Sequence, residues 1–417
     1  MHQVYVDEWA PLGEETFKKL RLNLPPGGWF PALQHLLWCI AESNLPYANL
    51  FFSPHLKTIS LLAAQSWDDT GVPPSILPTL ASTISALPTS SLERISVRFD
   101  HPTDVLGTSS LERISIGADY QTMPWAYFKD SFSSIVLHCG PSFTEYDTPT
   151  PLSNAALEHL TKLPHFRTWR IHGAPPKYHT SSFPLVFPPL RELTFGEHAV
   201  RGWFPLLRRL EGGASTTQSV TPFSRTKESL KVLNIDDISF IKIEASSVST
   251  IQYFRNLVNL NVEVYCHDGD DRGDCIFELN DHEVTELTMA LTQLESLLLG
   301  HACFEDTCLT TVACLLSISV HCNRLTKLEI HFDTTNIVDD LKNILEDPRF
   351  QQLRSLPRCP LRRLDVYQMP LDLDDSDFGT VANGMIDIFP SLKSCEGLEE
   401  SWTKLSGEIA KLRGDSG

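Results

Sequence analysis

The sequence predicts an α/β fold, a leucine-rich-repeat solenoid (horseshoe) with irregular repeats, a parallel inner sheet and outer helices. Three observations lead to this prediction. A short apolar motif recurs along the chain, segments with helical periodicity separate its later copies, and hydrophobic residues make up 42% of the 417 residues. Such a composition can bury a core, and such a length suits two or three ordinary domains or one repeat array.

The recurring motif is Leu-x-x-Leu-x-apolar, with another apolar residue in place of leucine in some copies. Side chains two residues apart on a strand share a face, so the fourth and sixth residues are expected to point inward. Spacings of 19 to 40 residues between copies straddle and exceed the roughly 20 to 29 residues of a leucine-rich repeat. The copies begin at Leu33, Leu56, Leu92, Leu111, Phe132, Phe166, Leu190, Leu230, Leu257, Leu294, Leu325, Leu361 and Leu392.

These copies set the expected organisation of the chain. Residues 1–30 precede the first copy and are assigned to an N-terminal cap or remnant segment. Residues 31–400 are assigned to the leucine-rich-repeat-like solenoid, and 401–417 to a C-terminal tail. No break in the pattern marks a second domain.

Helices are expected between the later copies. Asn280-x-x-Glu283 resembles a capping box and opens a run with Val284 and Leu287 on one face. Further helices are expected at 308–322, at 337–345 before Asp347-Pro348, and at 378–388 before Pro390.

One octapeptide, Thr-Ser-Ser-Leu-Glu-Arg-Ile-Ser, occurs twice, at 89–96 and at 108–115. An identity of this length indicates a recent duplication of a segment. Because an offset of 19 residues barely allows a strand and a turn, we expect disorder or distortion between Phe99 and Thr108.

Composition limits the partners and the compartment. Acidic residues outnumber basic ones by 52 to 34, a formal net charge of −18, so we expect no nucleic-acid or membrane partner. No apolar run approaches the ~18 to 20 residues of a membrane span, and the acidic first 15 residues do not resemble a signal peptide. Ten cysteines without any Asn-x-Ser/Thr site favour an intracellular protein, cytoplasmic or nuclear.

Motifs for chemistry are weak. The loop from His267 to Asp274 has carboxylates at calcium-ligand spacing, but Arg272 and Leu279 stand where further oxygen ligands are needed. The cysteines between 303 and 322 match no paired Cys-x-x-Cys zinc site, and Cys314 is expected in the core. No nucleophile elbow or phosphate-binding loop occurs. We therefore expect no catalytic residue, no metal and no cofactor.

The binding candidates lie where strand residues alternate with the inward positions. They would face solvent on the concave face of the horseshoe, and the alternative is an ordinary solvated sheet face. The candidates are Asn234, Asp236, Asn261, Glu263, Leu298, Glu329, His331, Asp365 and Tyr367.

Several stretches resemble a known family. The run from His321 to Ile330 and Cys359-Pro360 before Leu361 resemble the cysteine-containing leucine-rich repeats of F-box proteins. Residues 56–61, 186–195 and 254–263 are similar to F-box domain-containing proteins of mushroom-forming (basidiomycete) fungi. The resemblance covers roughly residues 30 to 400, the repeat region.

The resemblance implies a ubiquitin-ligase receptor. In that family an N-terminal F-box docks on the Skp-type adaptor of a cullin ligase, and the repeats hold the substrate. We find no F-box, because the stretches after Leu24-Pro25 and Leu45-Pro46 already carry the motif copies at Leu33 and Leu56.

We therefore expect a non-enzymatic protein–protein interaction module, by resemblance the substrate-recognition region of an F-box-type receptor. A Skp-type adaptor and a cullin would be further partners where a docking segment exists. The alternative is a free-standing leucine-rich-repeat scaffold, or a truncated relative, with no ligase role. An enzyme with a site scattered over the loops is the third possibility.

Overall fold

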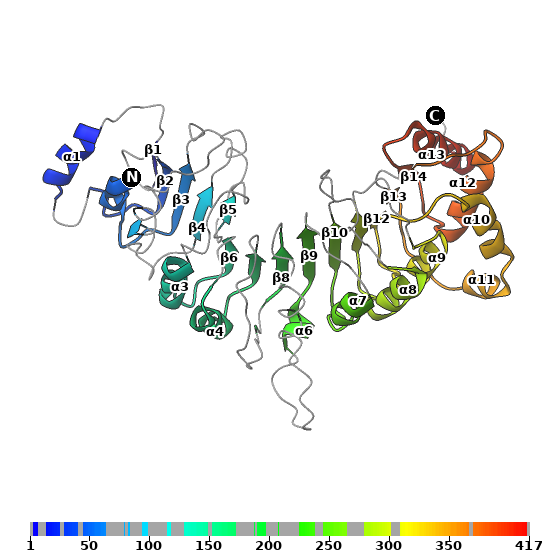
Figure 1. The fold of residues 1–417 in the computed structure, drawn as a ribbon, viewed down its shortest axis with the longest axis horizontal. Coiled ribbons are helices and arrows are strands. Elements are labelled where there is room, and N and C mark those ends of the chain that lie inside the picture. The colour runs from blue at the N-terminus through cyan, green and yellow to red at the C-terminus, as the bar shows by residue number, and fades with distance from the viewer. Residues whose placement is uncertain are drawn as a thin grey trace, which may run out of the picture. The chain divides into compact units, whose positions relative to one another are not determined.

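The fold is mixed α/β, with parallel strands that alternate with helices (Figure 1). The computed structural model describes residues 3–6, 14–25, 29–40, 45–63, 79, 82–83, 94–98, 115–117, 129–148, 152–171, 187, 190–196, 207, 225–237, 245–264, 279–301, 309–366 and 370–414. The strands form a five-stranded sheet in the order β1 to β5 and a nine-stranded sheet in the order β14 to β6.

The chain divides into two compact units. Unit 1 comprises residues 1–192 and 197–202, and unit 2 comprises residues 193–196 and 203–417. The elements of unit 1 are β1 (Gln3–Val6), α1 (Glu14–Leu22), β2 (His35–Ile40), the 3-10 helix η1 (Leu45–Phe51), β3 (Thr58–Ala63), β4 (Arg94–Arg98), β5 (Ser115–Gly117), α3 (Lys129–His138), β6 (Glu145–Thr148), α4 (Asn154–Lys162) and β7 (Thr168–Ile171).

Unit 2 alternates strands and helices up to its last helix, except that helices α10 and α11 follow one another directly. Strand β8 (Glu192–Phe195) contains the boundary between the units. The following elements are α6 (Arg225–Ser229), β9 (Val232–Asp237), α7 (Ala245–Ile251), β10 (Asn259–Val264), α8 (Asp281–Ala290), β11 (Ser296–His301), α9 (Ala313–His321), β12 (Lys327–Ile330), α10 (Ile337–Glu346), α11 (Pro348–Leu353), β13 (Arg363–Asp365), α12 (Phe378–Ile388), β14 (Ser394–Glu396) and α13 (Glu400–Arg413).

Strand register aligns the predicted motif positions. Leu260 of β10 pairs with Leu233 of β9 and with Leu297 of β11, so the fourth residues of three successive copies lie side by side. The inward residues are buried, with Leu260 and Val262 each 1% exposed. The prediction that these side chains enter the core is confirmed.

A shared turn leads into the strands. The first motif residue donates its backbone N–H to the carbonyl three residues earlier, as in Leu257 to Phe254 and Leu325 to Cys322, each at 3.0 Å. The next two N–H groups then share one carbonyl of the preceding strand segment, as Val258 and Asn259 share that of Lys231. These bonds satisfy the backbone where a helix ends, and they set the same register each time.

One predicted strand is wrong. The copy that begins at Phe132 lies in helix α3, where Phe132, Ile135 and Val136 are buried. Spacings of three and four residues define a helical face as well as the start of the motif, so the pattern alone was ambiguous. The strand at this place is β6, in which Tyr146 is buried and pairs with Trp169 of β7.

Both ends of the described chain carry packed elements. Strand β1 pairs with β2, and Phe17 of α1 stacks on Tyr47 with ring centres 5.6 Å apart. Residues 401–417, which we assigned to a tail, contain most of helix α13. Its Trp402 and Leu405 are fully buried, and the helix packs on α12 and β14.

Strands β4 and β5, which contain the last residue of each copy of the duplicated octapeptide, pair with each other. Ser96 of β4 pairs with Ser115 of β5, and Val97 pairs with Ile116, which is the same offset as the duplication. Register and duplication therefore agree. The distortion expected between Phe99 and Thr108 falls outside the described residues, as does the acidic loop 267–274.

In unit 2, Figure 1 shows α7, α8 and α9 along the same side of the strands. The buried motif residues face these helices. We call the opposite side of strands β9 to β14 the open face, because the side chains that alternate with the buried motif residues are half-buried or exposed.

Candidate binding surface

The open face carries the side chains that alternate with the buried motif positions. Strand register arranges them in two parallel rows that cross the strands. The central row is Asn234, Asn261, Leu298, Glu329, Asp365 and Glu396. The entry row, two residues earlier in each strand, is Val232, Asn259, Ser296, Lys327, Arg363 and Ser394.

The central row changes chemistry along its length. Two carboxamides come first, then Leu298, and then three carboxylates. The side chains of Asn261, Leu298 and Glu329 are all half-buried, so they form part of the surface. Neighbouring strands lie about 4.8 Å apart, which makes a row of six strands about 24 Å long. A row of this length can contact several residues of an extended segment.

Ion pairs cover the acidic end of the row. Lys327 Nζ lies 3.3 Å from Glu329 Oε2, and Arg363 lies 3.3 Å from Asp365 and 2.6 Å from Glu396. The two basic side chains are more than half exposed. Pairs as exposed as these contribute little to folding, typically ~0–1 kcal/mol, so their carboxylates can exchange one cation for another at low cost.

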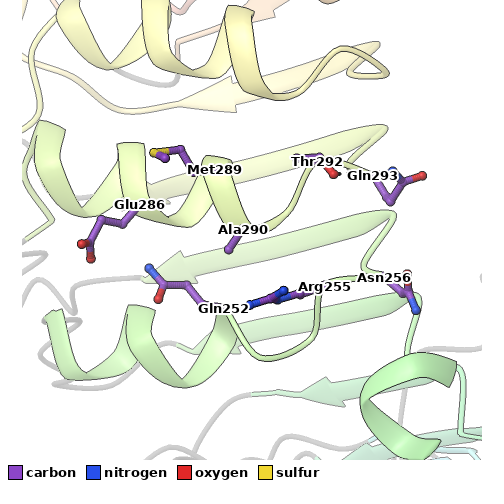
Figure 2. A pocket seen from close by; sticks show the side chains of 8 residues that line it. All are labelled: Gln252, Arg255, Asn256, Glu286, Met289, Ala290, Thr292 and Gln293. Carbon is purple, nitrogen blue, oxygen red and sulfur yellow. Dashed lines mark hydrogen bonds between the residues drawn. The ribbon is translucent and has the colours of Figure 1, made fainter. Parts of the chain in front are cut away.

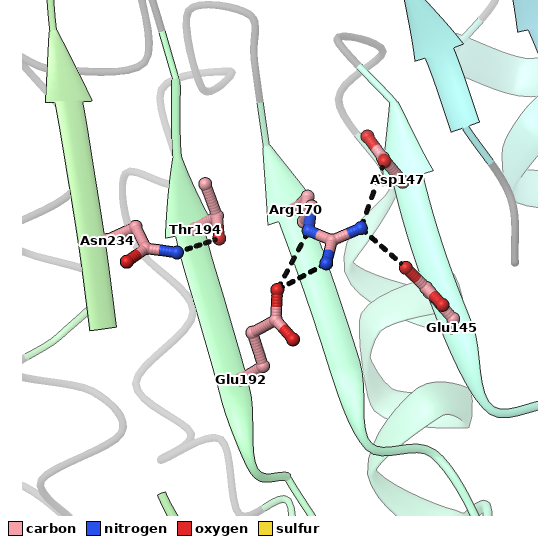
Figure 3. Close-up of polar contacts among 6 residues, drawn as sticks. All are labelled: Glu145, Asp147, Arg170, Glu192, Thr194 and Asn234. Atoms are coloured by element: carbon pink, nitrogen blue, oxygen red, sulfur yellow. Dashed lines mark hydrogen bonds and ion pairs between the residues drawn. The ribbon is translucent and has the colours of Figure 1, made fainter. Parts of the chain in front are cut away.

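The amide end of the row holds an unpaired acceptor. Asn234 donates its side-chain N–H to Thr194 Oγ1 at 3.2 Å (Figure 3). On the next strand, Asn261 Oδ1 is shielded from solvent and has no hydrogen-bond partner among the described residues. An acceptor in this state costs about 1–3 kcal/mol, a cost that a donor from a partner would remove.

The structure brings together five of the nine predicted residues: Asn234, Asn261, Leu298, Glu329 and Asp365. Glu263 lies half-buried two residues beyond Asn261 in β10. The backbone of Asp236 lies in β9, but its side chain and all of Tyr367 fall outside the described residues. Strand register therefore aligned the five predicted residues that lie in the central row.

The expected exposure of His331 is wrong. Its side chain is buried, with 4% exposed. Strand β12 ends at Ile330, and the chain after it bonds to the segment before α9. Thr310 Oγ1 donates to the His331 carbonyl at 2.9 Å, and Thr311 forms a bridge with Asp333.

A polar cluster of unit 1 was missed from the sequence. Arg170 of β7 contacts Glu145 Oε1 at 2.7 Å and Asp147 Oδ2 at 3.5 Å, both on β6 (Figure 3). Its Nε also donates to Glu192 Oε1 at 2.9 Å. All four side chains are at most a quarter exposed. The cluster is a guanidinium enclosed by three carboxylates.

The signal for this cluster was present in the sequence. Glu145 and Asp147 occupy the third and fifth positions of a motif copy that begins at Phe143. Recognising that copy would have placed Asp147 opposite Arg170, as the register does. Because the motif copy was placed at Phe132 and not at Phe143, the strand that carries Glu145 and Asp147 was not predicted.

The helix side of unit 2 carries an open groove of about 650 Å³ (Figure 2). It lies where α7 and α8 turn into the next strands. Its lining is Gln252, Arg255, Asn256, Glu286, Met289, Ala290, Thr292 and Gln293. The lining is mostly polar, and it includes no histidine or cysteine.

Within the described residues, no group of three or more His, Cys, Asp or Glu side chains is placed to hold a metal ion. A helix long and apolar enough to cross a membrane is likewise absent from that part of the chain. No protein-family model matches the chain, and no curated protein is significantly similar to it in sequence.

Proposed function

We propose that this chain is a non-enzymatic protein-binding module of the leucine-rich-repeat class that holds a partner protein on its open face. The observation that carries the proposal is the central row, in which amides, a leucine and carboxylates stand in line across six parallel strands. The shared turn before the strands and the repeated register support the repeat class.

The chemistry of the row favours a protein segment with a basic end. Leu298 offers an apolar contact, and Asn261 offers an acceptor that lacks a donor. Glu329 and Asp365 offer carboxylates whose present cations are exposed and exchangeable. The net charge of −18 opposes nucleic acid and anionic membranes as partners.

The resemblance to F-box proteins extends this proposal. By that resemblance the partner is a substrate of a cullin ubiquitin ligase, the ligase contact is a Skp-type adaptor, and the protein works inside the cell, in the cytoplasm or nucleus. The alternative is a free-standing scaffold that binds its partner without any ligase. Recovery of the Skp-type adaptor with the chain would distinguish a ligase receptor from a free-standing scaffold.

The test is affinity capture from a basidiomycete extract with three forms of the tagged chain. These are the wild type, a double variant of the row (L298D and E329K) and a control variant on the helix side (M289K). Met289 is 58% exposed, so its substitution tests general surface effects. We expect the wild type and M289K to capture the same proteins and the double variant to lose them.

Circular dichroism and thermal melting show whether each variant is folded. Identical capture by all three folded forms would contradict binding through the open face. Antibodies against the Skp-type adaptor and cullin then decide the ligase role. Their presence with the wild type supports a receptor, and their absence beside specific partners supports a scaffold.

A further inference from the structure

A basic segment interrupts this acidic chain. Between Pro348 and Leu364 the sequence contains five arginines and no Asp or Glu, although the whole chain has a net charge of −18. At physiological ionic strength charges beyond roughly 8 Å are largely screened, so the local arginines decide which ions this surface attracts.

Two of these arginines lie on one buried aromatic ring. The guanidinium carbons of Arg354 and Arg358 are 5.6 Å and 5.1 Å from the centre of the Phe350 ring. Phe350 itself is fully buried, which fixes the position of its ring beneath the two guanidinium groups. The two guanidinium groups over this ring repel each other, so an anion bound between them would stabilise both side chains in these positions.

Helix α12 supplies the opposite wall. Its Asp387 carboxylate pairs with Arg354, and its last carbonyls accept from Arg358 Nη1. Together with Ile386 and Pro390, these residues line an open pocket of about 300 Å³. The pocket lies where α12 ends and where the chain turns into β13, away from the open face.

Donors remain without acceptors at this pocket. Nε and Nη2 of Arg358 are shielded from solvent and have no hydrogen-bond partner among the described residues. Arg413 donates Nη2 to the Pro390 carbonyl, but its Nε also has no partner there. Burial and the charge of Arg354 both lower the pKa of Arg358. A bound anion would oppose both effects.

We propose that this pocket binds a phosphate group, with the exposed Arg354 as its first contact and Arg358 as its second. Guanidinium groups suit phosphate because their N–H donors match its oxygens in pairs. The Asp387 carboxylate pairs with Arg354 when phosphate is absent, and phosphate displaces this carboxylate on binding. The inference is independent of binding on the open face, since the two surfaces share no residue.

The test is isothermal titration calorimetry of the full chain with inorganic phosphate and with a tripeptide, acetyl-Gly-phosphoSer-Gly-amide. The unphosphorylated tripeptide is the negative control. R354Q removes the first contact, and R324Q is its matched control, because Arg324 is similarly exposed (54% against 45%) and also pairs with a carboxylate. D387N removes the competing carboxylate with little change of shape.

We expect R354Q to weaken phosphate binding by about tenfold or more, R324Q to change it by less than about twofold, and D387N to strengthen it. Tighter binding of the phosphorylated tripeptide than of inorganic phosphate would identify a phosphorylated protein as the source. Equal binding would identify free phosphate. Absence of heat with both probes, or equal weakening in R354Q and R324Q, would overturn the proposal.

Discussion

Burial decides the chemistry of the described cysteines. It raises the pKa of the Cys139, Cys322 and Cys395 thiols to about 12, and that of Cys359 to about 11. Cys314 is also buried, as expected for a core residue. A thiol acts as a nucleophile or a metal ligand through its thiolate, so these residues serve packing.

Thiol alkylation tests this role. At about pH 8 a thiol of pKa 12 is ionised in on the order of one molecule in ten thousand. We expect iodoacetamide to leave Cys139, Cys322, Cys359 and Cys395 unmodified in the native protein and to modify all four in guanidinium chloride. Peptide mass spectrometry reads the result. Rapid native modification of these sites would show that they are accessible and ionised.

The same raised pKa values make stability fall at alkaline pH. A thiol whose pKa rises from 9.0 to about 12 on folding stabilises the folded state fully below pH 9, and this contribution is lost as pH rises through about 12. We expect the urea midpoint to fall as pH rises above about 9. The fall should be shallower in a C322A variant, because that variant lacks one such thiol. Equal slopes in both proteins would exclude a contribution from Cys322.

Arg170 is expected to matter for stability because it holds three carboxylates together. We expect R170M to lower the free energy of unfolding by about 2–4 kcal/mol, since it leaves half-buried like charges side by side. Urea denaturation measures the change. R324M is the matched control, because it breaks an exposed pair with Glu295 and should cost less than about 1 kcal/mol. A loss for R170M no greater than that of the control would contradict a stabilising network.

At the level of elements, the sequence predicted the register between strands better than it predicted where the strands lie. Register followed the motif because the apolar residues at its fourth and sixth positions have one buried face to share. Helix α3 was misassigned because its spacing of three residues is common to both structures. Strand β6 was missed because its sixth motif residue is the polar Thr148.

The predicted capping box of α8 is confirmed. Asn280 Oδ1 accepts from the N–H groups of His282 and Glu283, and Glu283 Oε2 accepts from the Asn280 N–H at 2.9 Å. We expect N280A to lower the free energy of unfolding by about 1 kcal/mol, because helix donors lose their acceptor. N343A in the exposed interior of α10 is the control and should leave stability within about 0.5 kcal/mol of the wild type. Equal effects in urea denaturation would argue against the cap.

For the whole molecule, the local sequence pattern predicted the contacts between neighbouring strands. It did not predict the contacts between segments that lie outside the motif copies. The central row follows from register alone, so most of its residues were found. Arg354 and Arg358 meet Asp387 only because the segment after α11 lies against the end of α12, which no periodicity indicates. His331 is buried, and its carbonyl accepts from Thr310, a residue some twenty positions earlier that the motif does not include.

The proposed repeat class predicts how a defect spreads. In a solenoid each repeat contacts its neighbours, so damage at one end decays along the array. Trp402 of α13 is fully buried, and α13 packs against α12 and β14, the last strand of unit 2. W402A should cost about 3–5 kcal/mol, because it leaves a cavity under the last helix.

Hydrogen exchange with mass spectrometry measures that spread. We expect W402A to raise exchange most in β14 and α12, less in β13 and β12, and not detectably in β9 and β10. L412A is the control on the same helix, because Leu412 is 48% exposed and its loss leaves no cavity. A uniform rise from β14 to β9 would indicate a single cooperative core. A graded rise, with no change in L412A, is the behaviour of repeats stabilised by their neighbours.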